Sequence, residues 1–338
     1  IVSIKRIIKL KNLEMENKAI KREYLESDSF HEAFGDFVTK SPKIYSIFKY
    51  LQAVASSRQP ILITGESGVG KGVLAKIIAT ISRPGKPFVS VNLAGLDNQM
   101  FSDTLFGHVK GVYTSAQNTR QGMVIQAGSG TVFLDEIGEL PIQSQLKLLY
   151  LTQDGEYQQL GSDSIAHTDA RFIFATNQDL QAKQEAGEFR KDLFFRLNTH
   201  HVHIPPLRER REDIPLLIEH FMKQVSIEYR IDLPYLPDNV MRLLQSYDFP
   251  GNARQLKAVV YDAVMKAREG MLTVSGFEDL FTGAERTVEI RFDEDIPTIA
   301  DGFNTLIKKA LAAAGGYQDK AAAALGISNH TLSRRFRQ

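Results

Sequence analysis

The residues best suited to chemistry in this chain lie in the run 65–72, which reads Gly-Glu-Ser-Gly-Val-Gly-Lys-Gly. The apolar segment 61–64 precedes the run and a helical apolar pattern at 73–78 follows it, so we expect a strand, a glycine-rich turn and a helix. Glycines let backbone amides approach an anion, and the helix N-terminus adds partial positive charge. The pattern is typical of a phosphate-binding P-loop whose lysine, Lys71, reaches the β- and γ-phosphates of a nucleotide.

One position of this loop departs from the usual pattern. Ser or Thr normally follows the lysine, whereas Gly72 has no hydroxyl to offer a magnesium ion. A metal must then be held by other residues or through water. The residues that we expect to contact the nucleotide from this loop are Gly65, Glu66, Ser67, Gly68, Val69, Gly70, Lys71 and Gly72.

A second motif supports nucleotide binding. The apolar run 131–134 ends in Asp135 and Glu136, so a buried strand would deliver two acids at its C-terminal edge, as in a Walker B motif. We expect Asp135 to be a Mg²⁺ ligand and Glu136 to polarise the attacking water. A glycine-rich loop without function is the alternative, but two motifs in this order, about sixty residues apart, predict ATP and Mg²⁺ binding.

The composition bounds the class of protein. The chain has 338 residues, 43% of them hydrophobic, and a formal net charge of +1, which favours a globular protein of two or three domains. No apolar run approaches the ~20 residues of a membrane helix, and the first residues do not resemble a signal peptide. Without cysteine there are no disulfides or thiolate metal sites, and we expect a cytoplasmic location. The chain starts at Ile1 rather than Met, which leaves room for an upstream receiver or sensor domain.

The first 210 residues divide into two regions. Residues 1–33 carry a narrow apolar stripe among charged residues and predict an amphipathic linker helix, with a frayed chain end as the alternative. Residues 34–210 alternate apolar runs with helix-like segments, which predicts an α/β subdomain with a parallel sheet and its ligand at the carboxyl ends of the strands. The expected strands are 61–64, 88–91, 131–134, 171–175 and 202–204.

Three further regions follow. Residues 211–283 are helical in period over 213–230 and 238–271, and we interpret them as a helical lid subdomain. Residues 284–302 are acidic and non-periodic, which indicates a linker. Residues 303–338 form the last region.

This C-terminal region is locally basic, with six Lys and Arg residues against Asp319 alone. Small residues at 321–324 allow close helix packing, Gly326 allows a turn and Ser328 caps a second helix, so the pattern predicts a helix-turn-helix. A basic helix pair without DNA is the alternative, but the charge favours binding of duplex DNA, by a dimer. The side chains expected to face DNA are Asn329, His330, Thr331, Ser333, Arg334 and Arg337.

From about Ser41 to Gln338 the chain resembles the NtrC-type bacterial enhancer-binding proteins, AAA+ ATPases with a Fis-type helix-turn-helix that activate sigma-54 RNA polymerase. The resemblance implies an α/β fold: an AAA+ P-loop parallel sheet with a helical lid, joined to an all-α DNA-binding domain. It also implies a hexameric ring and, in many members, a two-component system. The motifs that carry it are FVSVN at 88–92, LFGH at 105–108, FLDEI at 133–137, ATN at 175–177, FRKDLFFRL at 189–197, PPLRER at 205–210 and PGNAR at 250–254.

The resemblance also implies roles for single residues. Asn92 would hold Glu136 in its inactive position, and Asn177 would sense the γ-phosphate. Arg190 and Arg196 look like arginine fingers offered to the ATP of a neighbouring subunit, and Arg254 looks like the lid arginine. A fixed guanidinium stabilises a transferring phosphoryl group by ~10³–10⁵ in rate, so such a site should be nearly inactive in a monomer. Solvated helix charges are the alternative for both fingers.

The loop that the family presses against sigma-54 departs from its hallmark, Gly-Ala-Phe-Thr-Gly-Ala. Here it comprises Gly111, Val112, Tyr113, Thr114, Ser115 and Ala116. Ser115 replaces the second glycine and so loses easy access to positive φ, and Val109 stands where the family commonly has glutamate. We therefore expect a regulator that hydrolyses ATP at subunit interfaces and acts on polymerase with the housekeeping sigma factor. The alternative is an ordinary sigma-54-dependent activator.

A histidine cluster invites a metal interpretation, which we set aside. Only His201 and His203 share a face of a strand, and no acid or cysteine nearby in the sequence completes a ligand set. A structural role is expected for these residues.

Overall fold

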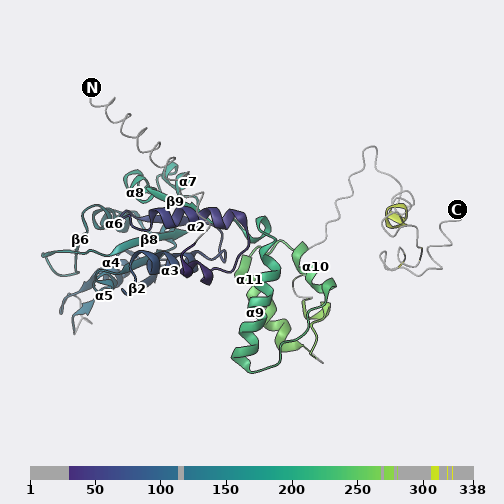
Figure 1. Ribbon diagram of the computed structural model, residues 1–338. Coiled ribbons are helices and arrows are strands. Elements are labelled where there is room, and N and C mark those ends of the chain that lie inside the picture. The colour runs from purple at the N-terminus through teal and green to yellow at the C-terminus, as the bar shows by residue number, and fades with distance from the viewer. Residues whose placement is uncertain are drawn as a thin grey trace, which may run out of the picture. The chain divides into compact units, whose positions relative to one another are not determined.

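The computed structural model describes residues 30–112, 118–267, 270–277, 280, 306–311, 318 and 322. The chain forms two compact units, Ile1–Phe281 and Thr282–Gln338, which are described separately. The first unit contains an α/β part and a helical part (Figure 1).

A five-stranded parallel sheet forms the centre of the α/β part. Its strand order is β2-β5-β8-β1-β9, and every neighbouring pair is parallel. The sequence prediction of five strands is confirmed, with β9 beginning two residues before the expected start. The strands are β1 (Ile61–Thr64), β2 (Phe88–Asn92), β5 (Thr131–Asp135), β8 (Arg171–Thr176) and β9 (His200–His203).

Helices cover the sheet because alternate strand residues are apolar on both faces. Ile61 and Ile63 join one core cluster with the side chains of α2 and α3, whereas Leu62 joins a second cluster with those of α4, α5, α6 and α8. These helices are α2 (Pro42–Val54), α3 (Lys71–Ser82), α4 (Asn98–Phe106), α5 (Met123–Ala127), α6 (Ile142–Asp154), α7 (Leu180–Glu185) and α8 (Lys191–Leu197).

Short elements complete the α/β part. The hairpin strands β3 and β4 pair antiparallel, as do β6 and β7. The bounds are η1 (Glu32–Asp36), β3 (Gly107–His108), β4 (Arg120–Gln121), η2 (Ile137–Glu139), β6 (Glu156–Gln158), β7 (Ile165–His167) and η3 (Leu207–Glu209).

The helical part has a core of its own and contains α9 (Asp213–Tyr229), α10 (Asp238–Ser246), α11 (Asn252–Lys266) and η4 (Val274–Phe277). Figure 1 shows the three helices gathered beside the α/β part, and η3 leads into them from β9. The stretch 238–271, helical in period, forms two helices, α10 and α11. Pro250 cannot donate to a helical hydrogen bond, and Phe249 adopts a positive φ of 47°, so the helix is interrupted before α11.

Both ends of the chain are described only in part. The predicted linker helix at 1–33 lies mostly outside the described residues, but Phe30 and Phe34 pack against Phe48 of α2, so the α/β core begins before residue 34. In the second unit, residues 306–311 are helical and Ile307 and Ala322 are buried. All six predicted DNA-contact residues lie outside the described residues.

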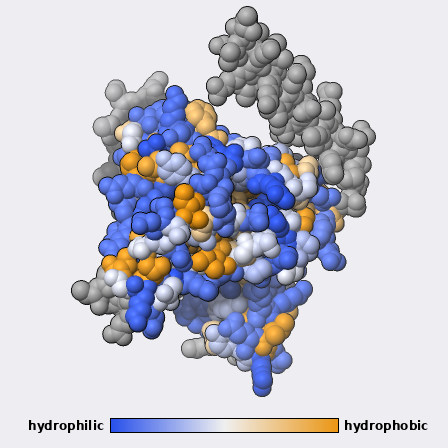
Figure 2. Space-filling view, turned by 90° about the vertical axis from the view of Figure 1, so that its left-hand side faces the viewer, coloured by the Kyte–Doolittle hydropathy of each residue, from blue (hydrophilic) through white to orange (hydrophobic). Residues whose placement is uncertain are grey.

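Figure 2 shows a face on which hydrophobic residues form separate patches among hydrophilic ones. Among the residues that the structure describes, no helix is long and apolar enough to cross a membrane.

Candidate nucleotide site

The predicted P-loop connects β1 to α3, as the sequence indicates. Gly65, Gly68 and Gly70 all adopt positive φ, at 148°, 82° and 111°, which other L-residues rarely adopt. Space is also short: a Cβ on Gly68 would lie 2.4 Å from the Gly251 carbonyl oxygen, and a Cβ on Gly70 would lie 2.8 Å from the Phe37 ring. The loop therefore needs these glycines for its backbone shape and for its contacts.

Lys71 lies at the first turn of α3 and is 7% exposed. Its Nζ donates to the carbonyl oxygens of Gly65 at 2.8 Å and Glu66 at 3.2 Å. Burial lowers the pKa of Lys71, and the nearby carboxylates of Glu136 and Asp135 oppose that shift. A bound phosphate would place a negatively charged partner beside this buried ammonium and favour its charged form. Lys71 therefore fits the predicted role at the phosphates.

The predicted catalytic acids lie at the carboxyl end of β5. Glu136 adopts a left-handed conformation with φ of 56°, which costs energy for a non-glycine residue and is found often at active sites. Its backbone N–H donates to Asp135 Oδ1 at 3.0 Å, and its own Oε2 accepts from the backbone N–H of Asn177 at 3.4 Å. The structure thus brings the acids together with Asn177, which follows the neighbouring strand β8.

Asn92 ends β2, next to Asp135 in the register of the sheet. Its Oδ1 accepts from the backbone N–H of Ala94 at 2.9 Å. The side-chain amide of Asn92 therefore lies at the same sheet edge as Asp135 and Glu136. Its predicted role in holding Glu136 stays a prediction.

A cavity of about 400 Å³ lies beside the P-loop. Thr64, Gly65 and Glu66 line it from the end of β1, and Asn177 lines it from the end of β8. His201 and His203 also line it, and both rings bond the Thr64 hydroxyl, at 2.8 and 3.1 Å. The histidines therefore share one face of β9, as predicted, and their bonds are to a hydroxyl.

The carboxylate of Asp135, at the end of β5, fits a magnesium ion. Mg²⁺ usually keeps several waters and takes only one or two carboxylates, with substrate phosphates as further ligands. Asp135 supplies such a carboxylate, whereas Gly72 supplies no side-chain ligand.

The helical part contacts the P-loop directly at the N-terminus of α11. Ala253 donates from its backbone N–H to the carbonyl oxygen of Gly68 at 3.1 Å. Arg254, the predicted lid arginine, donates from Nη1 to Ser67 Oγ at 2.8 Å. The first residue of α11, Asn252, donates from Nδ2 to the Ser67 carbonyl oxygen at 3.0 Å.

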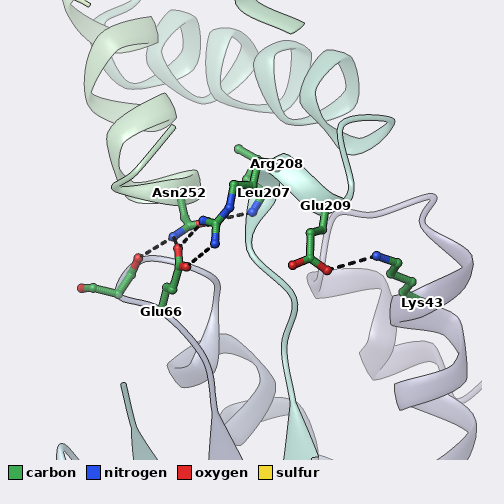
Figure 3. Close-up of polar contacts among 7 residues, drawn as sticks. Lys43, Glu66, Leu207, Arg208, Glu209 and Asn252 are labelled. Carbon is green, nitrogen blue, oxygen red and sulfur yellow. Dashed lines mark hydrogen bonds and ion pairs between the residues drawn. The ribbon is translucent and has the colours of Figure 1, made fainter. Parts of the chain in front are cut away.

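Three residues of this contact were not singled out from the sequence. Arg208 forms a bidentate ion pair with Glu66, and Asn252 donates to the same carboxylate (Figure 3). Arg210 is buried, pairs with Asp213 and donates from Nη2 to the Val69 carbonyl oxygen at 2.8 Å. All three belong to the PPLRER and PGNAR motifs, and membership of these motifs was the signal that could have found them.

The two predicted arginine fingers lie around α8 and have partners within the chain. Arg190 donates to both carboxylate oxygens of Asp192, at 3.0 and 2.7 Å. Arg196 donates from Nε and Nη2 to the Thr152 carbonyl oxygen, at 3.0 and 2.7 Å. Arg196 also lines a cavity of about 240 Å³ formed by residues 58–60 before β1 and by the start of β8. It therefore lies at the sheet edge opposite to the P-loop.

Of the predicted polymerase-contact loop, Gly111 and Val112 are described, and 113–116 lie outside the described residues. The base of the loop is held by polar contacts. His108 bonds Asp103 through Nδ1 and the Asn118 carbonyl through Nε2, and Arg120 pairs with the same aspartate.

Comparisons with known proteins agree with this geometry. Residues 37–203 match the Sigma-54 interaction domain, residues 208–289 match the AAA+ ATPase lid domain, and residues 305–338 match the bacterial regulatory proteins of the Fis family. The three matches follow one another along the chain in the predicted order. The fold is therefore that of an AAA+ protein with a helical lid and a C-terminal helix-turn-helix.

Individual relatives give the same result. The chain is 44% identical over 233 residues to the regulatory protein AtoC of Escherichia coli (strain K12), covering 69% of this chain and 50% of AtoC. It is 34% identical over 327 residues to the DNA-binding transcriptional regulator NtrC of the same strain, covering 90% of this chain and 70% of NtrC. The crystal structure of NtrX from Brucella abortus in complex with ADP is similar, with a TM-score of 0.68 and 27% identity over 98% of this chain and 74% of that one.

The chain belongs to the NtrC family of bacterial enhancer-binding proteins, transcription regulators whose central domain is an AAA+ ATPase. The predicted family and fold class are confirmed. The chain spans half the length of AtoC and 70% of NtrC.

Proposed function

We propose that this chain is an ATP-hydrolysing, DNA-bound regulator of transcription whose active sites are completed between neighbouring subunits. One observation carries the proposal. Lys71, Asp135 and Glu136 approach one another at one edge of the sheet, whereas Arg196 lines a cavity at the opposite edge. The strand between these edges, β1, has four residues and rises roughly 13 Å, too far for the guanidinium to serve the P-loop of its own chain.

The first half of the active site comes from one subunit. Lys71 and the P-loop amides hold the phosphates, and Arg254 approaches the nucleotide from the lid. Glu136 orients the attacking water through its carboxylate, Asn92 holds that carboxylate in its inactive position, and Asn177 senses the γ-phosphate. Asp135 would hold Mg²⁺, which would supply positive charge to stabilise the negative charge of the transferring group.

The second half comes from the neighbouring subunit, as Arg190 and Arg196. Each guanidinium can move to a phosphate because its present partner is replaceable: an exposed carboxylate for Arg190 and a single carbonyl oxygen for Arg196. A phosphate in a water-poor interface is a stronger partner than either. Because every site needs a neighbour, a closed ring, which we propose to be a hexamer, is the arrangement that completes all sites.

Residues 303–338 supply the DNA-binding half of the function. The helix-turn-helix would place Asn329, His330, Thr331, Ser333, Arg334 and Arg337 on the major groove and its phosphates, in a dimer on an enhancer or operator site. A protein that binds chromosomal DNA works in the cytoplasm. An upstream receiver or sensor domain would supply the input signal, as in a two-component system.

For the polymerase partner we propose the holoenzyme with the housekeeping sigma factor. Ser115 and Val109 alter the loop that the family presses against sigma-54, while Tyr113 and Thr114 keep an aromatic ring and a hydroxyl for contact. The match of residues 37–203 to the Sigma-54 interaction domain favours a second candidate, ordinary sigma-54-dependent activation, because that stretch includes the loop.

Transcription in vitro from a cognate promoter distinguishes the two candidates. Each holoenzyme is supplied separately, with and without ATP, and Glu136→Gln serves as a variant that binds ATP without hydrolysing it. We expect transcripts with the housekeeping holoenzyme. ATP-dependent open complexes with the sigma-54 holoenzyme alone would establish the second candidate.

A further inference from the structure

We propose that Glu66 is a positioning residue that couples the nucleotide loop to the lid, through its carbonyl oxygen on one side and its carboxylate on the other. The inference rests on the proposed nucleotide site and names the residue through which that site controls α11. Glu66 belongs to the P-loop by sequence, yet its carboxylate is directed toward η3 and α11 (Figure 3).

The carboxylate of Glu66 accepts three hydrogen bonds from outside the P-loop. Arg208 donates to both oxygens, at 2.6 and 2.8 Å, and Asn252 Nδ2 donates to Oε2 at 3.0 Å. The hydrogen bond from Arg208 lowers the pKa of Glu66 most, and the hydrogen bond from Asn252 has a smaller effect. Together they hold this pKa at about 2, so the carboxylate is ionised throughout the physiological range. Both side chains of the ion pair are about 40% exposed, so the contact fixes an orientation more than it stabilises the fold.

Asn252 ties three segments together on the lid side. Its Nδ2 donates to Glu66 and to the Ser67 carbonyl oxygen, and its Oδ1 accepts from the backbone N–H of Leu207 at 2.7 Å. The residue is fully buried and adopts a positive φ of 52°, which asparagine tolerates better than most residues. With both ends of its amide bonded, Asn252 holds the start of α11 in one orientation relative to the P-loop and η3.

The backbone of Glu66 faces the phosphate side. Its carbonyl oxygen accepts from Lys71 Nζ at 3.2 Å, and Gly65 accepts a second N–H of the same ammonium. A phosphate that accepts a hydrogen bond from Lys71 Nζ competes with these carbonyl oxygens. This competition changes the forces on the Glu66 peptide. Because the side chain of the same residue is held by Arg208 and Asn252, that change reaches the lid, and by reciprocity the lid position changes nucleotide affinity.

The sharpest variant is Glu66→Gln, which keeps the shape and replaces one acceptor with an NH₂ group. That group would face the donors of Arg208 or Asn252, so the three-way contact cannot form. The matched control is Glu209→Gln. Glu209 follows Arg208 and pairs with Lys43 of α2 at 3.1 Å, with both side chains more than half exposed (Figure 3). The two variants remove the same charge from the same region, and only one removes the link between the P-loop and the lid.

The chain has no cysteine, so two can be introduced for a fluorophore pair. Suitable positions are Met100 on α4, 53% exposed, and Ile227 on α9, 79% exposed. Single-molecule energy transfer then reports the distance between the α/β part and the lid in the full chain, with and without ADP. Calorimetry on the same proteins gives ADP affinity, and a thermal melt shows that each variant is folded.

We expect ADP to shift the energy-transfer distribution of the parent protein and of Glu209→Gln equally. Glu66→Gln should lose that shift, show a broader distribution, and bind ADP about 5–10-fold more weakly, in the usual range for coupled sites. Arg208→Gln should reproduce this result from the other side of the contact, and it takes the place of Glu66→Gln if that variant does not fold. An ADP-dependent shift of parental size in folded Glu66→Gln, or none in the parent that binds ADP, would overturn the proposal. Failure of the parent to bind ADP would overturn the nucleotide site itself.

Discussion

The carbonyl oxygen of Gly68 accepts a hydrogen bond from the backbone N–H of Ala253 at 3.1 Å, so the P-loop and the first turn of the lid helix α11 are in direct backbone contact. The loop that is expected to hold phosphates is also a surface on which the lid rests. Changes in this loop should therefore alter lid position as well as nucleotide binding.

Two glycines of the loop should respond oppositely to alanine. Gly68→Ala places a Cβ 2.4 Å from the Gly251 carbonyl oxygen at φ of 82°, so the lid must move away and stability should fall by at least ~1–2 kcal/mol. Gly72→Ala meets nothing closer than 3.8 Å in a helical turn and should raise stability by ~0.5–1 kcal/mol. Urea unfolding of both variants checks this, and equal effects would contradict the described contact.

Lys71→Met should separate stability from binding. The buried ammonium has a lowered pKa, so replacing it with an apolar side chain of similar length should leave the free energy of unfolding unchanged or raise it by about 1 kcal/mol. The variant should lose stabilisation by ATP, which amounts to ~2.7 kcal/mol at a hundredfold excess over Kd. Thermal melts with and without ATP measure both effects, and an undiminished ATP-dependent rise in Tm would refute the assignment of Lys71.

The contact of Glu66 should have a defined pH window. Its pKa is lowered from 4.5 to about 2, so the contact contributes its full stability above pH 4.5 and loses it as pH falls toward 2. The difference in unfolding free energy between the parent protein and Glu66→Gln should therefore be constant from pH 7 to 4.5 and shrink below. His203 also faces this carboxylate, so His203→Gln in both backgrounds is the control. A difference that disappears already between pH 7 and 5 would show another titrating group at work.

DNA binding should depend on the C-terminal basic side chains. Arg334→Ala and Arg337→Ala should weaken binding to duplex DNA, and each lost phosphate contact should reduce the slope of log K against log salt by about one. Gel-shift titrations over a range of salt concentrations measure this. Unchanged affinity after deletion of residues 303–338 would place DNA binding elsewhere.

Much of the α/β part could be predicted from sequence because its signals are local. Short runs of residues that favour strands, such as 131–134, form strands. The acids that follow the run 131–134 lie at the carboxyl end of the strand, where parallel sheets bind their ligands. The helical period over 238–271 does not show where one helix ends and the next begins, and the break before α11 lies at Phe249 and Pro250. The lid region was predicted from its helical period and the Fis-type region from its charge and helix-turn-helix pattern, and the matches to known families confirm their type.

The network around Glu66 could not be predicted because it joins residues far apart in the chain. Nothing in the period or composition near residue 66 indicates a partner at Arg208 or Asn252, 142 and 186 residues away. Similarly, the sequence identified Arg196 as a finger by resemblance, but its bond to the Thr152 carbonyl depends on how α8 packs against α6.

The active sites should be shared between subunits, and a mixing experiment tests this directly. Lys71→Ala disables the P-loop of its own chain, and Arg196→Ala disables the finger, so neither variant alone should hydrolyse ATP. In an equal mixture about a quarter of the interfaces join an intact P-loop to an intact finger, and ATPase activity should recover to about that fraction of the parent rate. No recovery, with both variants shown to assemble together, would mean that the arginine acts within its own chain and would contradict the shared site.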